Sequence, residues 1–438
     1  MTATLTDLLP AARRAVAPAR RGRVRSVVGL SFEVSGVDAA VGDAVVVHAA
    51  SGPLVGEVVA LTTSGIVCMP FGEMRGVRTG DRVEPLDSPL QVHVGEALLG
   101  RVLDGLGRPM DDGPSIAGLP TVGIDGVPPH PLRRAMVREP LQLGVRAIDT
   151  LIPCGKGQRL GIFAGSGVGK SSLLSMIVRC TDADVSVLAL IGERGREVRE
   201  FIENDLGPEG LARSVVVVAT SDTPPLVRLQ SAFDATRIAE WFRDQGRDVV
   251  LMMDSLTRCA MAQREIGLSA GEAPATRGYP PSVFALLPRL LERAGAGEHG
   301  SITGLYTVLV EADDLNDPIG DAARSILDGH IALSRRLANA GHFPSIDVLS
   351  SVSRVANALL DPEQLALTAE VRSLLAAYRD ARDLVDIGAY VPGSNALVDR
   401  ALHLKADIDG FLRQAIDEIA TRESAWSHLH AVLRGEGA

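Results

Sequence analysis

The 438-residue sequence is poor in aromatic residues, at 3%, and its four cysteines show no paired metal-binding spacing. It has no apolar run long enough to span a bilayer and no secretory-type apolar segment near its start. Its net charge of −10 argues against nucleic acid as the main partner, because phosphate backbones are bound by basic surfaces. These absences predict an intracellular protein with reduced cysteines, peripheral to a membrane at most.

What the sequence does contain is a glycine-rich loop of the phosphate-binding kind. An apolar run, Leu160–Ala164, enters Gly165-Ser-Gly-Val-Gly-Lys-Ser171, which opens a helical pattern. Glycines allow backbone N–H groups to converge on phosphate oxygens, and a helix N-terminus adds partial positive charge. The residues assigned to nucleotide binding are Gly165, Ser166, Gly167, Val168, Gly169, Lys170, Ser171 and Ser172.

Within this loop, Lys170 is expected to reach the β and γ phosphates and the Ser171 hydroxyl to ligate Mg²⁺. The strict motif has glycine at position 164, where this chain has alanine. We expect that methyl group to be tolerated at the end of a strand. The loop therefore predicts a nucleoside triphosphatase.

Two other predicted strands end in carboxylates. Val249–Asp254 is an apolar run ending in an aspartate, which can hold the hydration sphere of Mg²⁺ beside Ser171. A second apolar run ends at Glu193, which can orient or deprotonate an attacking water. The charged residues around Glu193 also suit a strand-end ion-pair cluster without a catalytic role.

The chain divides into four parts, with predicted ranges 1–21, 22–92, 93–361 and 362–438. The first carries leucines and arginines at weak helical spacing, which indicates either a frayed end or a segment that docks on a partner. The second has short β-type runs punctuated by glycines, typical of a small barrel or a sandwich.

The third part alternates strand and helix patterns, which predicts an α/β fold with a mostly parallel sheet and helices on both faces. Its predicted elements are the strands Arg159–Ala164, Val185–Gly192, Ser214–Thr220, Asp248–Asp254, Ile302–Glu311 and His330–Ser334, and the helix Leu226–Gln245. The fourth part loses strand character and predicts a helical domain over Pro362–Ala389 and Asn395–Leu433.

Several segments, in the same order, resemble the ATPases of type III protein export, which are relatives of the catalytic subunits of rotary ATP synthases. They are Gly161–Ser171, Ile191–Asn204, Met252–Arg258, Ala260–Leu268, Pro274–Phe284, Glu311–Ile319 and Pro344–Ser353. The resemblance implies an N-terminal β-barrel, a central P-loop ATPase domain, a C-terminal helical domain and a homohexamer. It also implies that ATP is the substrate and Mg²⁺ the cofactor.

The resemblance further implies roles for individual residues. Glu193 would polarise the lytic water, Arg194 and Arg258 would contact the γ-phosphate side, and Asp254 would join the magnesium sphere. Phe343 lies where relatives stack an aromatic ring on adenine. Arg354 matches the arginine finger that reaches into the neighbouring subunit's site. Without the resemblance, Arg354 has the character of an ordinary loop arginine.

The function implied is a Mg-ATP-hydrolysing motor at the cytoplasmic face of an inner-membrane export apparatus. Implied partners are a stator-like regulatory protein on the N-terminal segment, the export gate, chaperones and export substrates. Phe201–Asn204 and Pro274–Ser282 are more similar to the flagellar branch, and the virulence injectisome is the alternative.

Two other functions within the superfamily are weighed against the motor. A non-catalytic ring subunit typically has glutamine at the position of Glu193, which cannot serve as a base. An RNA-translocating helicase needs a basic, aromatic-bearing barrel surface. Residues 22–92 contain only Phe32 and Phe71 as aromatics.

Overall fold

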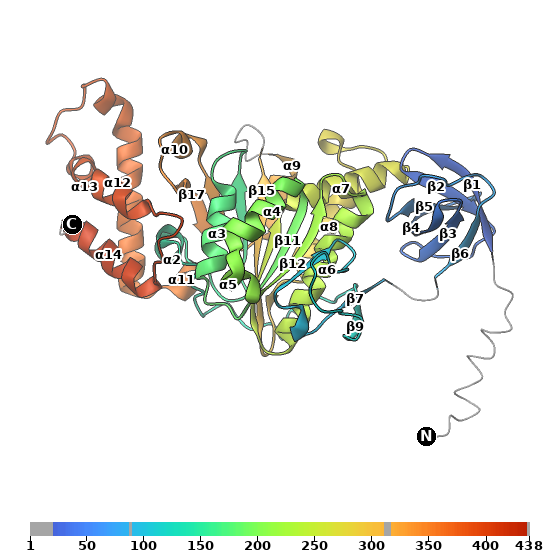
Figure 1. The fold of residues 1–438 in the computed structure, drawn as a ribbon. Coiled ribbons are helices and arrows are strands. Elements are labelled where there is room, and N and C mark those ends of the chain that lie inside the picture. The colour runs from blue at the N-terminus through green and yellow to red at the C-terminus, as the bar shows by residue number, and fades with distance from the viewer. Residues whose placement is uncertain (1–20, 87–89, 311–316, 436–438) are drawn as a thin grey trace. The chain divides into compact units, whose positions relative to one another are not determined.

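The computed structural model describes residues 21–86, 90–310 and 317–435 (Figure 1). The predicted partner-binding segment, apart from its last residue, and the start of the Glu311–Ile319 motif lie outside the described residues. The chain separates into two compact units. One comprises residues up to Leu90 with the short segments 224–226 and 265–273, and the other comprises the remainder. The domain ranges predicted above stay predictions.

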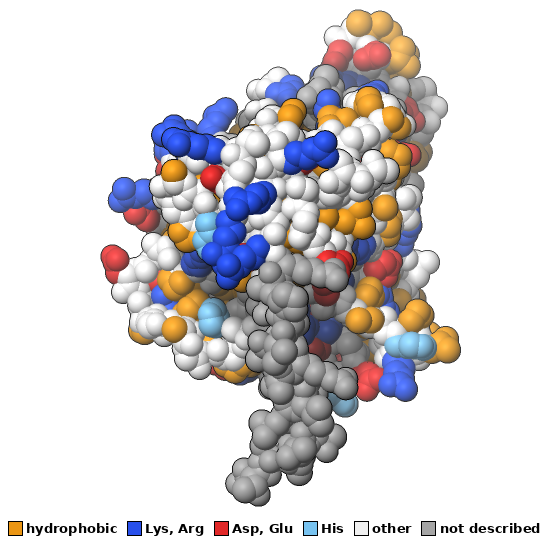
Figure 2. Space-filling model, turned by 90° about the vertical axis from the view of Figure 1, so that its right-hand side faces the viewer, with side chains coloured by type: hydrophobic (Ala, Val, Ile, Leu, Met, Phe, Trp, Pro, Cys, Tyr) orange, Lys and Arg blue, Asp and Glu red, His pale blue; other side chains and the backbone are white. Residues whose placement is uncertain are grey.

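The first unit contains a closed barrel of six strands in the order β1-β2-β5-β4-β3-β6. Side chains alternate along β1, where Val24 is buried while Arg23 and Arg25 are exposed, so that one face supplies the barrel core. Figure 2 shows basic and apolar side chains exposed on the side of the molecule that it views. The strands are β1 (Gly22–Val28), β2 (Ser31–Ser35), β3 (Ala44–Ala49), β4 (Gly52–Thr62), β5 (Gly65–Pro70) and β6 (Arg82–Pro85). The barrel, rather than the sandwich, is confirmed.

The second unit is built on a nine-stranded sheet, ordered β17-β16-β10-β15-β13-β11-β12-β8, with β14 paired to β15. All pairings are parallel except β16 with β17 and β14 with β15, which confirms the mostly parallel sheet. The strands are β8 (Arg101–Asp104), β10 (Arg159–Ala164), β11 (Val185–Glu193), β12 (Ser214–Thr220), β13 (Asp248–Asp254), β14 (Gly295–Ala296), β15 (Ser301–Leu309), β16 (Gly329–Leu333) and β17 (Ile346–Ser353). A separate two-stranded antiparallel sheet pairs β7 (Gln91–His93) with β9 (Thr121–Gly123).

Two hydrophobic cores cover the two faces of this sheet. Successive residues of β11 point to opposite faces, so Leu188 and Leu190 join one core while Val187 and Ala189 join the other. Helices α2 (Arg146–Leu151), α3 (Lys170–Cys180) and α4 (Gly195–Glu200), with the π-helical turn η2 (Phe201–Leu206) and α5 (Gly207–Ala212), pack on the first face. Helices α6 (Pro225–Asp244), α7 (Leu256–Ser269), α8 (Pro281–Leu291) and α9 (Pro318–Ile326) pack on the second. Burial of both faces explains why the central strands are continuous apolar runs.

The C-terminal region is helical, as predicted, but it is divided differently. Its helices are α12 (Pro362–Asp386), α13 (Ala396–Leu412) and α14 (Arg422–Arg434), while the short α10 (Arg335–Asn339) and α11 (Ala356–Leu359) flank β17. The N-termini of α12, α13 and α14 are capped by the side chains of Asp361, Asn395 and Thr421, respectively. The prediction of one helical stretch over Asn395–Leu433 was wrong, because the chain leaves the helix between Leu412 and Arg422.

Side-chain hydrogen bonds explain this break. The guanidinium of Arg146, which is buried, donates to the carbonyls of Phe411 and Arg413 and pairs with Glu418. The buried Gln414 amide accepts from the Arg146 backbone N–H at 2.9 Å and donates to the Gly144 carbonyl at 2.8 Å. Carbonyls at the end of α13 are therefore satisfied by α2 rather than by a further helical turn.

Candidate active site

The parallel sheet brings the predicted site residues to one edge. In the strand order, β10 is followed by β15, β13 and β11, and all four run in the same direction. The glycine-rich loop follows β10, Asp254 ends β13 and Glu193 ends β11. Because parallel strands present their carboxyl ends together, these three features meet at one edge of the sheet.

The loop itself is held from outside. Gly167 and Gly169 have φ values of 74° and 88°, in the left-handed region that glycine adopts without strain. The carbonyl of the buried Val168 accepts a hydrogen bond from Ser345 Oγ at 2.6 Å, and the Ser166 carbonyl accepts one from Arg335 at 3.1 Å. Two backbone carbonyls of the loop are thus anchored by side chains from elsewhere in the chain.

The first turn of α3 begins at Lys170, and the side chains of Ser171 and Ser172 are exposed there. Ala164, the departure from the strict motif, is the last residue of β10 and pairs with Leu309 of β15. Its methyl group is fully buried in the sheet rather than in the loop. The geometry explains how alanine is accommodated.

Lys170 is the centre of the polar cluster. Its Nζ contacts both carboxylate oxygens of Asp254 and lies 3.5 Å from Oε1 of Glu193. Thr307 of β15, which is fully buried, donates from Oγ1 to Oδ1 of Asp254 at 2.7 Å. Asp254 is therefore fixed from two sides, by a cation and by a hydroxyl.

Glu193 has an environment that favours its protonated form. Burial raises the pKa of Glu193 and the charge of Asp254 adds to this, whereas the charge of Lys170 opposes it. The carboxyl of Glu197 raises the pKa further through a hydrogen bond and through its charge. A carboxyl whose pKa is raised beside a fixed cation suits proton transfer.

The two predicted arginines near Glu193 differ in their placement. The Arg258 side chain runs over Gly192, where an added Cβ would lie 2.9 Å from its Cγ. Its Nε atom is buried and has no hydrogen-bond partner within the described part of the chain. Arg194 is exposed and pairs with Glu197 at 3.2 Å, so it reaches Glu193 only through that carboxylate.

The ring of Phe343 lies against the phosphate loop. A Cβ added to Gly169 would be 3.1 Å from Cδ1 of Phe343, and the residue is 44% exposed. Arg354 follows β17 and is exposed, and its guanidinium donates to the Arg324 carbonyl at 3.0 Å. The structure thus brings Phe343 to the loop. Arg354 instead forms its hydrogen bond with Arg324 of the same chain.

The donor set fits magnesium of the kind that accompanies a nucleotide. Within residues 21–86, 90–310 and 317–435 there is no group of three or more His, Cys, Asp or Glu side chains that could hold a metal alone. Mg²⁺ is commonly bound by one or two carboxylates together with substrate phosphates and waters. Asp254 and the Ser171 hydroxyl at the same sheet edge meet that requirement.

Three site residues escaped the sequence reasoning. Thr307 holds Asp254, and Ser345 holds the Val168 carbonyl of the loop. Glu197 forms a hydrogen bond with Glu193. A threonine within a buried apolar strand was the one available signal, because its hydroxyl requires a partner. Ser345 lies in the resembling segment Pro344–Ser353, but nothing local indicated its contact with Val168, 177 residues away in sequence.

A glycine-rich loop that follows a central strand, with its lysine beside two strand-end carboxylates, defines a P-loop nucleoside triphosphatase.

Family models show which family of P-loop proteins this chain belongs to. The nucleotide-binding domain of the ATP synthase alpha/beta family matches residues 144–353, and the beta-barrel domain of that family matches residues 24–87. The C-terminal domain of the type III secretion ATPase EscN matches residues 360–431. The chain therefore belongs to the ATP synthase alpha/beta family, and it is an ATPase.

Individual relatives cover nearly the whole chain. A flagellum-specific ATP synthase of Bacillus subtilis is 51% identical over 95% of this chain and 96% of its own length. A type 3 secretion system ATPase of Xanthomonas euvesicatoria is 50% identical over 94% of each chain.

The structure of the assembled ATPase EscN from enteropathogenic E. coli has a TM-score of 0.90 at 46% identity. It covers 94% of this chain and 100% of its own. EscN in complex with its central stalk EscO gives a TM-score of 0.86 at 45% identity, covering 94% of this chain and 100% of its own. In the part of the chain that the structure describes, no helix is both long and apolar enough to cross a membrane.

Proposed function

We propose that this chain is the Mg-ATP-hydrolysing motor of a flagellar type III export apparatus. The observation that carries the proposal is the position of Lys170 between Asp254 and Glu193, beside the glycine-rich loop. Flagellum-specific relatives with about half of their residues identical support the flagellar assignment. The site of action is the cytoplasmic face of the inner membrane, where the motor drives unloading and export of flagellar subunits.

The residues divide the chemistry among them. Lys170 and the loop N–H groups hold the β and γ phosphates, and Ser171 with Asp254 would hold Mg²⁺. When bound, the metal would neutralise charge on the phosphate oxygens. Glu193 accepts the proton of the attacking water, and Arg258 supplies positive charge beside the γ-phosphate. Arg194 positions Glu193 through Glu197.

Phe343 provides an aromatic face for adenine at the far side of the loop. Its half-exposed ring lies on Gly169, next to the phosphate cradle, as such a role requires. Arg354 acts in trans, in the site of the next subunit of a homohexamer. The exposed position of its guanidinium and the assembled state of EscN support this role.

The partners of this motor are the export gate, chaperones, export substrates and a stator-like regulator that binds the N-terminal segment. The complex of EscN with its stalk supports partner binding by a protein of this architecture. The injectisome is the second candidate system, favoured by the 50% identity to a type 3 secretion system ATPase.

The other two alternatives are disfavoured by particular residues. Glu193 supplies the base that a non-catalytic ring subunit lacks. For an RNA-translocating helicase, both barrel aromatics are unsuitable, since Phe32 and Phe71 are buried at 1% and 8% exposure. Neither ring is available for base stacking.

Two measurements test the proposal. Mg²⁺-dependent ATPase activity is measured over a range of protein concentrations, and we expect specific activity to rise as rings assemble. The gene is then expressed in two mutants, one lacking the flagellar ATPase and one lacking the injectisome ATPase. Restored motility without restored secretion supports the flagellar assignment, whereas the reverse replaces it with the injectisome.

A further inference from the structure

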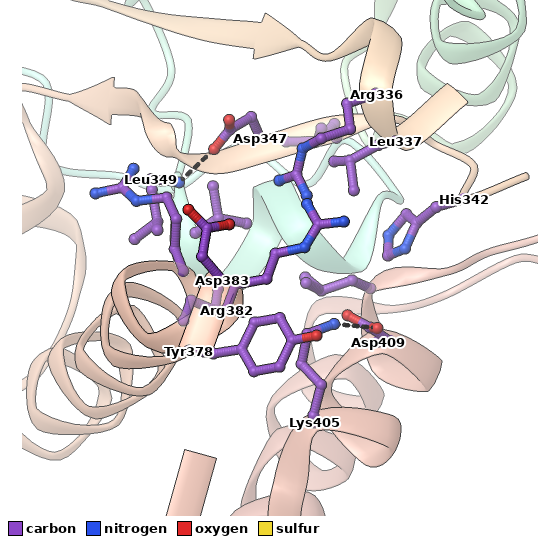
Figure 3. Close-up of a pocket in the computed structure, with 15 residues that line it drawn as sticks. Arg336, Leu337, His342, Asp347, Leu349, Tyr378, Arg382, Asp383, Lys405 and Asp409 are labelled. Carbon is purple, nitrogen blue, oxygen red and sulfur yellow. Dashed lines mark hydrogen bonds and ion pairs between the residues drawn. The ribbon is translucent and has the colours of Figure 1, made fainter. Parts of the chain in front are cut away.

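A cavity of about 340 Å³ lies between the C-terminal helices and the chain that leads into Phe343 (Figure 3). Residues of α12 and α13 form one wall, and residues of α10 and β17, with His342, form the other. No residue of the phosphate loop lines it, and neither do Glu193 and Asp254. Its volume falls in the range of small-molecule sites, roughly 300–1,000 Å³.

Two guanidinium groups enter this cavity from opposite walls. Arg336 extends from α10 and Arg382 from α12, and their heads approach one another in Figure 3. Arg336 forms no ion pair with any residue that the structure describes. Arg382 has one partner, Asp386, at 3.3 Å on the exposed side of its helix. Guanidinium groups form charge-assisted, often bidentate hydrogen bonds with carboxylates and phosphates, so this lining suits an anion.

The carboxylates of the cavity do not neutralise these arginines. Asp409 is paired with Lys405, and Asp347 accepts hydrogen bonds from the backbone N–H groups of Leu349 and Ser350 at 3.0 and 3.1 Å. Asp383, the remaining acid, is exposed. With Arg379, the lining holds four basic and three acidic side chains, so positive charge is left over.

His342 gives independent evidence of a missing partner. The residue is only 3% exposed, and Nε2 is buried without a hydrogen-bond partner among the described residues. Its ring faces the cavity in Figure 3. Buried polar atoms in native proteins are almost always satisfied, so an unpaired one facing a cavity offers a hydrogen-bond position to an occupant.

The rest of the lining is apolar. Apolar surface that the uncharged part of a ligand would cover comes from Leu337, Leu375, Leu412 and the ring of Tyr378. Inorganic ions alone would leave this surface wet, whereas an organic molecule would bury it.

We propose that this cavity binds a small organic anion, with its carboxylate or phosphate between Arg336 and Arg382 and with His342 as a hydrogen-bond partner. The apolar body of the ligand lies against the leucines and Tyr378. Because His342 is adjacent to Phe343 in the chain, an occupant holds the segment that lines the nucleotide site. By linkage, the anion and the nucleotide then alter each other's affinity. This coupling rests on the proposed nucleotide site, whereas binding in the cavity does not.

The test uses full-length protein saturated with ADP, so that the phosphate loop is occupied. An initial ADP titration reports on the nucleotide site alone. Phenyl phosphate, benzoate and the uncharged benzyl alcohol are then titrated by calorimetry. We expect binding of at least one of the two anions, and weaker or no binding of the alcohol. Arg336→Gln and Arg382→Gln should each weaken anion binding by ~10-fold, the loss expected for one charge-assisted hydrogen bond.

Arg199→Gln is the matched control, because Arg199 is an exposed, ion-paired arginine on α4, away from the cavity lining. It should leave the affinity unchanged. Both test arginines reach solvent, and thermal melting checks that the variants fold. No binding of either anion, equal binding of benzyl alcohol, or wild-type affinity in both arginine variants would overturn the proposal. Failure of the ADP titration would instead count against the proposed ATPase site.

Discussion

Nζ of Lys170 lies 3.5 Å from Oε1 of Glu193, while the same ammonium contacts both oxygens of Asp254. One cation thus faces the candidate base and the candidate metal ligand together. A phosphate group that draws Lys170 toward itself would release both carboxylates for their own tasks. Binding and hydrolysis should therefore be separable by mutation.

The first prediction separates them. Glu193→Gln keeps the size of the side chain but removes the base, so Mg-ATP should still bind while turnover falls by at least ~10²-fold. Lys170→Ala removes the cation and should lower both nucleotide affinity and turnover. Fluorescent-nucleotide binding and phosphate release measure the two effects. Near-wild-type turnover in Glu193→Gln would rule out the assigned base.

The second prediction concerns the subunit interface. Arg354→Ala should bind ATP normally yet hydrolyse it about 10³-fold more slowly, even in assembled rings, if its arginine acts in trans. Mixing it with Lys170→Ala protein should restore part of the activity, because some interfaces then pair an intact loop with an intact finger. Mass photometry verifies co-assembly. Mixed rings that stay inactive contradict the trans role.

The third prediction concerns the loop glycine under Phe343. Gly169→Ala places a methyl group 3.1 Å from the ring on a backbone at φ 88°. The left-handed conformation alone should cost about 1–2 kcal/mol of unfolding free energy. We also expect weaker nucleotide binding, because the loop must shift. Chemical denaturation and ADP titration measure both.

Gly410→Ala is the control for this substitution, since Gly410 lies in α13 with open space around its Cβ position. Alanine there should be neutral or slightly stabilising. If Gly169→Ala behaves like Gly410→Ala in both assays, the loop does not require glycine at this position.

The fourth prediction concerns the N-terminal segment. Deleting residues 2–18 should leave nucleotide binding intact, because no predicted catalytic residue lies there. The same deletion should abolish co-purification with the regulatory partner, since a helix as short as the one predicted from this sequence gains its stability by docking. Pull-down with the purified regulator measures this. A truncated protein that binds the regulator with wild-type affinity would assign the contact to another part of the chain.

The elements at the site were predictable from sequence because they are extreme in composition. β10, β12 and β13 have the predicted ends, since a strand buried on both faces is an apolar run with sharp polar limits. The glycine-rich loop is equally local. The apolar pattern did not predict the end of β15 correctly. This strand ends at Leu309, two residues before the predicted Glu311.

Contacts between distant segments account for what the sequence could not reveal. The end of α13 depends on Arg146, more than 260 residues earlier, and no periodicity records that partner. The Arg194–Glu197 pair competes with the γ-phosphate role assigned to Arg194, and only coordinates show it. The roles of Glu193, Asp254, Arg258, Phe343 and Arg354 stay predictions.

Gln414, which together with Arg146 ends α13, also joins this helix to the segment that carries Phe343. Its backbone N–H donates to the Phe343 carbonyl at 3.0 Å, while its side-chain amide donates to the Gly144 carbonyl ahead of α2 at 2.8 Å. A displacement of the C-terminal helices would therefore also pull on Phe343, because Gln414 joins that segment to the end of α13.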